Sequence, residues 1–155
     1  MRKNKLIYFA LTVPVIGIGM LCGYFLIHGE TIGTVNVSAD FFADYWNLSR
    51  ILLLQFIFGF SVLAVPVCYL SLFYQSLIYG YSIFLINSLQ QPMLAVFCIS
   101  MYVLILSVYV CTSVKSITLS KTMIPVIPRI KSYMKYACLL LLLQVIKSGF
   151  LILFY

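Results

Sequence analysis

The longest stretch without a charged residue covers residues 51–114, and it restricts the possible folds of this chain more than any other feature. It is 64 residues long, whereas one membrane-spanning helix needs about 20 apolar residues. The whole chain is 64% hydrophobic and 8% charged, against about 25% charged residues in a soluble domain. These values predict an all-α fold, a polytopic transmembrane helix bundle that forms one domain over residues 1–155.

The distribution of charge predicts the number of crossings. Basic residues gather before residue 6 and again over residues 115–135, whereas every acidic residue lies within residues 28–50. The positive-inside rule places both basic segments in the cytoplasm, so residues 51–114 must cross an odd number of times. We therefore predict about five spans, with the N-terminus in the cytoplasm and the C-terminus outside, at residues 6–27, 51–72, 75–90, 93–114 and 136–155. The short segment 75–90 has an alternative, a re-entrant segment.

The segment SADFFADYWNLSR, residues 38–50, predicts a short external helix at the membrane interface that leads into the second span. Ser38 is a suitable N-cap residue. Phe41 and Tyr45 are four residues apart, as are Phe42 and Trp46, so these aromatic side chains share one side of the helix. Tyrosine and tryptophan are typical of the lipid headgroup region.

Glycine and proline interrupt the long apolar stretch at Gly59, Pro66 and Gly80. A proline inside a helix removes a backbone hydrogen bond, so Pro66 predicts a kink in the second span. We expect a turn at residues 74–76 and packing of the kinked helix against Gly80 in the next span. A polar cavity or partner groove around Pro66, Gln75 and Ser76 is the alternative.

Two further features concern helix association. Gly19 and Gly23 form a GxxxG motif, which allows close helix approach within the chain or between copies. Lys147 lies inside the last predicted span, where a charge suggests a functional site, although its long side chain could also extend to the interface. Because no acidic residue is expected within the spans, a functional Lys147 would pair with a polar group of a partner protein.

The sequence offers few groups for chemistry. Its single histidine, His28, is distant from the scattered cysteines, so we expect no metal site. It contains no phosphate-binding loop of the GxxxxGK[ST] type, and no acid within the spans for proton coupling. We expect no enzyme, no cofactor and no nucleic-acid partner; the lipid bilayer is the expected environment.

The order of features in NLSRILLLQFIFGFSVLAVPVCYLSLFYQSLIYGYSIFLI resembles the stage II sporulation protein M family of bacterial membrane proteins. An asparagine precedes a glycine- and proline-containing apolar helix, and a second glycine-containing apolar segment follows. The matching positions are Asn47, Gly59, Pro66 and Gly80. The resemblance covers about residues 6–121 and is strongest over residues 46–86.

The resemblance implies a role in the bacterial cell membrane, at the division or engulfment septum. There the chain would be a non-catalytic scaffold that anchors peptidoglycan hydrolases during sporulation. The aromatic residues of the external helix would form the docking surface for these partners: Phe41, Phe42, Tyr45 and Trp46. The alternative function is a small transporter or permease subunit that acts as a homo-oligomer, with Gly59, Pro66 and Gly80 shaping the substrate path.

Overall fold

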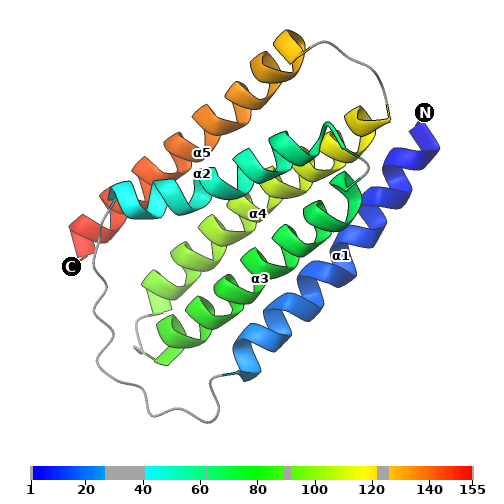
Figure 1. The fold of residues 1–155 in the computed structure, drawn as a ribbon. Coiled ribbons are helices and arrows are strands. Elements are labelled where there is room, and N and C mark those ends of the chain that lie inside the picture. Colours follow the sequence, from blue (N-terminus) through cyan, green and yellow to red (C-terminus); the bar gives the residue numbers. More distant parts are fainter. Residues whose placement is uncertain (1, 27–40, 62, 89–91, 122–125, 155) are drawn as a thin grey trace.

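Five helices make up the part of the chain that the computed structural model describes, namely residues 2–26, 41–61, 63–88, 92–121 and 126–154. They are α1 (Arg2–Phe25), α2 (Phe41–Phe58), α3 (Ala64–Ser88), α4 (Pro92–Ser120) and α5 (Val126–Phe154). The predicted all-α helix bundle is confirmed (Figure 1).

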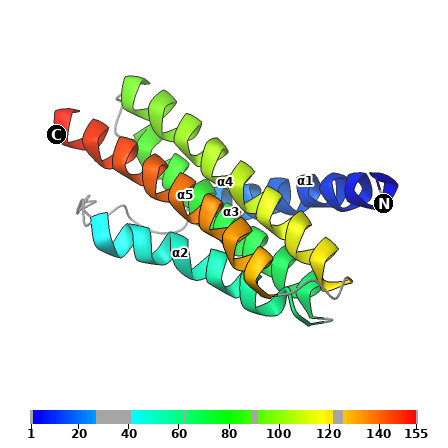
Figure 2. The same ribbon diagram turned by 90° about the horizontal axis from the view of Figure 1, so that it is seen from above.

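Consecutive helices run in opposite directions along the bundle, as Figure 1 shows. Helix α4 is central and contacts all four other helices. Helix α1 packs on α3 and α4 at one side, whereas α2 and α5 pack together at the other (Figure 2). Helix α2 also contacts α3 and α4, so it closes the bundle between α3 and α5.

Four of the described helices are long and apolar enough to cross a membrane, so the chain is a multi-pass membrane protein. Their candidate spans are Leu6–Phe25, Ala64–Ile86, Pro92–Ser120 and Val126–Ile152. Large apolar side chains cover much of their outer surface, as a lipid environment requires. Helix α2, with 18 residues, is not one of the four.

The predicted span at residues 51–72 is wrong, because the chain turns between α2 and α3 at residues 59–63. The Ser61 hydroxyl accepts a hydrogen bond from the Leu63 N–H at 3.0 Å, which is a common turn geometry for serine. The turn expected at residues 74–76 is also wrong, since α3 continues through it. Hydropathy is high on both sides of Gly59, so it gave no sign of the break.

Pro66 does not kink a span. It is the third residue of α3, where the backbone N–H would have no partner within the helix. The proline therefore suits the start of a helix, and the predicted kink is wrong.

The predicted external helix is part of α2 and is not separate from the bundle. Leu48, Ile51 and Leu52 of α2 are all buried against neighbouring helices. The expected N-cap, Ser38, lies outside the described residues.

Glycines join α1 to α3. A Cβ atom on Gly23 would lie 2.0 Å from the Leu77 carbonyl oxygen, and one on Gly80 would lie 2.2 Å from the Met20 carbonyl oxygen. Gly19 is equally tight against Ser76 of α3. The GxxxG motif thus serves packing within the chain, and Gly80 packs against α1.

Arg129 ties three helix ends together at the end of the bundle where the N-terminus lies (Figure 1). From the first turn of α5, its guanidinium donates hydrogen bonds to the Gly59 carbonyl at 2.8 Å and to the Leu119 carbonyl. It also lies over the Phe60 ring at 4.4 Å. A cation at the carboxyl ends of α2 and α4 is favourable because carbonyl groups there lack partners within the helix.

Candidate functional site: a polar groove between α2 and α3

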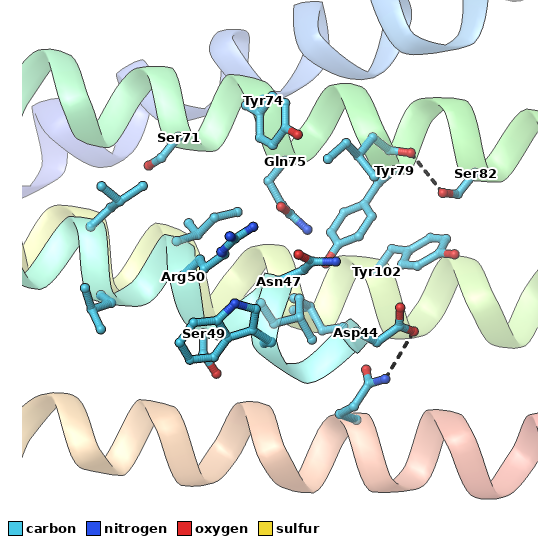
Figure 3. Close-up of a pocket in the computed structure, with 18 of the residues that line it drawn as sticks. Asp44, Asn47, Ser49, Arg50, Ser71, Tyr74, Gln75, Tyr79, Ser82 and Tyr102 are labelled. Carbon is cyan, nitrogen blue, oxygen red and sulfur yellow. Dashed lines mark hydrogen bonds between the residues drawn. The ribbon is translucent and has the colours of Figure 1, made fainter. Parts of the chain in front are cut away.

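A groove of about 910 Å³ runs between α2 and α3, and we call it the α2–α3 groove. Apolar side chains from both helices form part of its wall, and polar side chains from four helices line the rest (Figure 3). The polar lining consists of Asp44, Asn47, Ser49, Arg50, Ser71, Gln75, Tyr79, Ser82, Tyr102, Gln144 and Lys147.

A buried hydrogen-bond network fixes α2 where it approaches α3 and α4. The Gln55 amide nitrogen donates to the Ser113 hydroxyl at 2.9 Å and to the Ser71 hydroxyl at 3.2 Å. Its amide oxygen accepts a hydrogen bond from Thr112, and its backbone carbonyl accepts one from Ser116 at 2.7 Å. Because Gln55 is fully buried and its amide is satisfied, this network is structural.

Lys147 and Asp44 form an ion pair on the groove wall, with 3.0 Å between Nζ and the carboxylate oxygen. The exposed fraction is 18% for the Lys147 side chain and 43% for Asp44. The Gln144 amide donates to the same carboxylate oxygen at 3.3 Å (Figure 3). The expectation that Lys147 would need a partner protein is wrong, because Asp44 lies on α2 and not on an external loop.

This ion pair lies within the length of the spans. Lys147 is seven residues before Phe154, which corresponds to about 10 Å along the helix. Its amino group also lies 6.0 Å from the ring centre of Tyr102 in α4, and Tyr102 is ten residues inside Pro92. Charges at such positions are costly in lipid, and they mark functional sites by default.

Arg50 brings a second cation to the groove. Its guanidinium lies 5.9 Å from the centre of the Trp46 ring, one helical turn earlier in α2. Both side chains line the groove, and Trp46 is 59% exposed. Within the described part of the chain, no carboxylate forms an ion pair with Arg50.

Aromatic side chains form the inner wall. Tyr79 of α3 and Tyr102 of α4 stack with their ring centres 4.4 Å apart. Tyr79 is 5% exposed, and its hydroxyl has no hydrogen-bond partner among the described residues. In Figure 3, Gln75 and Tyr79 both point from α3 toward α2. A buried hydroxyl without a partner is expensive, and Gln75 of the same helix is the polar side chain beside it.

Only some of the residues predicted for the site line the groove. Asn47 and Trp46 line the groove, whereas Gly59, Pro66 and Gly80 are not among its lining residues. Tyr45 is half-buried. The side chains of two further predicted docking residues lie outside the described part, namely Phe41 and Phe42.

Sequence reasoning missed the importance of Asp44 and Arg50, because both were assigned to an external segment. Gln75 was considered for a polar cavity and does line the groove, but Ser76 faces α1 instead. Tyr79 carried no signal, since tyrosine is common in this chain. The spacing of Asp44, Asn47 and Arg50 at three-residue intervals was the available clue, since such residues lie along one side of a helix.

No protein-family model matches the chain, and the comparisons with curated proteins and with solved structures give no match.

Proposed function

We propose that this chain is a non-catalytic membrane scaffold that anchors peptidoglycan-remodelling enzymes at a division or engulfment septum. The observation that carries the proposal is the exposed Trp46 at the edge of the groove. It lies one position before Asn47, the first of the four positions that match the stage II sporulation protein M family. Exposed tryptophan is enriched at the centres of protein interfaces.

The use of polar groups within the bundle supports a scaffold. Gln55, Thr112, Ser113 and Ser116 join helices to one another, and Arg129 joins helix ends. Polar side chains that bond one helix to another stabilise a single arrangement of helices, and an anchor needs such a fixed arrangement. A partner that reaches Trp46 would contact the side of the bundle, so we expect it to bring a membrane-spanning segment.

We propose the bacterial cell membrane as the location, with the N-terminus in the cytoplasm. Lys121, the residue after α4, contacts Tyr8 of α1, so the two basic regions share one end of the bundle. The positive-inside rule favours the cytoplasm for that end, and it then favours the outside for the C-terminus.

Photocrosslinking from position 46 tests the scaffold. A photoreactive phenylalanine analogue replaces Trp46, and the matched control carries it at Leu142, an exposed residue of α5. We expect peptidoglycan hydrolases in the adducts from position 46 and not in those from position 142. Adducts without a hydrolase, or the same hydrolases from both positions, would refute the proposal.

A transporter subunit is the second candidate, and the polar side chains that line the groove from four helices favour it. It predicts solute flux into liposomes that hold the purified chain. Cys68 is fully buried and does not line the groove, so a cysteine at Ser71 is the better probe of water access. Resistance of that cysteine to water-soluble thiol reagents would count against transport.

A further inference from the structure

The α2–α3 groove opens toward the side of the bundle. Leu53, Leu70 and Tyr74 line it, and their exposed fractions are 51%, 66% and 60%. In a multi-pass membrane protein, large apolar side chains with this exposure face lipid tails. An occupant of the groove therefore has an apolar part that passes these side chains and a polar part that reaches the inner wall.

The charges of the groove favour a negatively charged polar part. Two cations, Arg50 and Lys147, line it together with one described anion, Asp44. Lys147 and Asp44 neutralise each other at 3.0 Å, whereas the described contact of Arg50 is with the Trp46 ring. No hydrogen bond from the guanidinium to another described residue is found, so its donors are available to an external acceptor, and its planar fork matches phosphate geometry.

The position of Arg50 also favours an anion. It is nine residues after Phe41, so its Cα lies about 14 Å along α2. The backbone near it is inside the bundle, since the carbonyl of Leu48 accepts a hydrogen bond from the buried Tyr109 of α4 at 2.8 Å. A cation beside lipid tails is stabilised when water and headgroups move toward it.

We propose that the α2–α3 groove binds the phosphate headgroup of an anionic membrane lipid. Arg50 is the cation for the phosphate, and the amide of the exposed Asn47 supplies a further donor at the same wall. The acyl chains leave the groove past Leu53 and Leu70. Trp46 lies beside the headgroup, where tryptophan is common in membrane proteins.

Fluorescence quenching tests this site directly, because Trp46 is the single tryptophan of the chain. The full-length protein is reconstituted in phosphatidylcholine vesicles that contain phosphatidylglycerol, with bromine on the acyl chains of one lipid or the other. Bromine quenches only when its lipid lies beside Trp46. We expect the brominated phosphatidylglycerol to show about a fivefold higher association, the effect of one basic side chain on an anionic lipid.

Two variants isolate the role of Arg50. Arg50→Gln should reduce the preference to about one, and Arg50→Lys should keep part of it because the charge remains. The control Lys131→Gln removes the same charge from an exposed position of α5 and should keep the full preference. Each preference is a ratio within one variant, so a change in Trp46 emission alone does not affect it; circular dichroism checks that each variant is folded.

Three outcomes would overturn the proposal. The first is equal association of both lipids in the wild type, and the second is an unchanged preference in a folded Arg50→Gln variant. The third is loss of the preference when inorganic phosphate is added to the buffer, because the groove would then take the free ion. A second measurement adds a membrane-spanning peptide with a central glutamate to the vesicles. If both lipids associate equally with Trp46 and the peptide changes the Trp46 emission, the groove binds a helix instead of a lipid.

Discussion

The ion pair between Lys147 and Asp44 links residues 103 positions apart in the sequence. Lys147 was predictable as a charge within a span, but its partner was not. The aromatic and acidic character of residues 38–50 is equally typical of a helix on the membrane surface. Only the packing of Leu48, Ile51 and Leu52 into the bundle places Asp44 opposite Lys147.

A double-mutant cycle measures this pair. Loss of one partner from a fully buried pair costs about 3–5 kcal/mol, and we expect less, about 1–3 kcal/mol, for Lys147→Leu because Asp44 is 43% exposed. The double variant with Asp44→Asn should recover part of the loss. Unfolding in detergent micelles supplies the free energies, and a coupling near zero would contradict the pair.

The hydrogen bond from Gln55 to Ser113 has a matched test on the same helix. Ser113 is fully buried and accepts this bond, whereas Ser107 is exposed and donates only to Val103 of its own helix. Ser113→Ala should lower the free energy of unfolding by about 0.6–1.5 kcal/mol, and Ser107→Ala should leave it unchanged. Equal effects of the two substitutions would show that the network is not a stabilising contact.

At the scale of helices, the boundary between α2 and α3 shows what hydropathy omits. The apolar stretch from residue 51 to residue 72 is long enough for one span, and proline within it suggested a kink. The chain instead turns at Gly59, whose missing side chain makes room for the Ser116 hydroxyl of α4: a Cβ there would lie 2.7 Å away. This neighbour lies 57 residues further along the chain and cannot be read from the local sequence.

The contact between α1 and α3 predicts a contrast between two glycines of α1. Gly23→Ala places a methyl group 2.0 Å from the Leu77 carbonyl oxygen, whereas Gly17 has nothing within 4 Å of the new atom. We expect Gly23→Ala to lower the melting temperature in micelles, because α1 must move away from α3. Gly17→Ala should leave it equal or slightly higher, since alanine favours helices.

A melting temperature that Gly23→Ala leaves unchanged would show that α1 is not held closely against α3. If Gly23→Ala leaves the melting temperature unchanged and Gly17→Ala lowers it, the contact with α3 would lie on the opposite side of α1.

For the whole molecule, the sequence predicted the class of the fold. A charge-free stretch of 64 residues allows little besides a helical membrane protein. The two basic segments led us to expect an even number of passes between the N-terminus and Lys115, and this number stays a prediction. Tyr8 and Lys121 do lie in contact at one end of the bundle. The groove was not predictable in this way, because it arises from four helices whose partners are set by packing.

The direct test of the fold on which both proposals rest is a cross-link between α2 and α3. Gln55 and Ser71 are in hydrogen-bond contact at 3.2 Å in the structure. On one continuous helix through residues 51–72 they would instead be about 24 Å apart. Both positions are changed to cysteine in a background without the five native cysteines, and a short bis-methanethiosulfonate reagent is added to membranes.

Intact-mass spectrometry then distinguishes one reagent molecule that links both cysteines from two reagent molecules that each modify one cysteine. The structure predicts one intramolecular bridge between positions 55 and 71. Suppose that the protein is folded and that each cysteine carries its own reagent molecule. This result would contradict the turn at residues 59–63 and with it the groove.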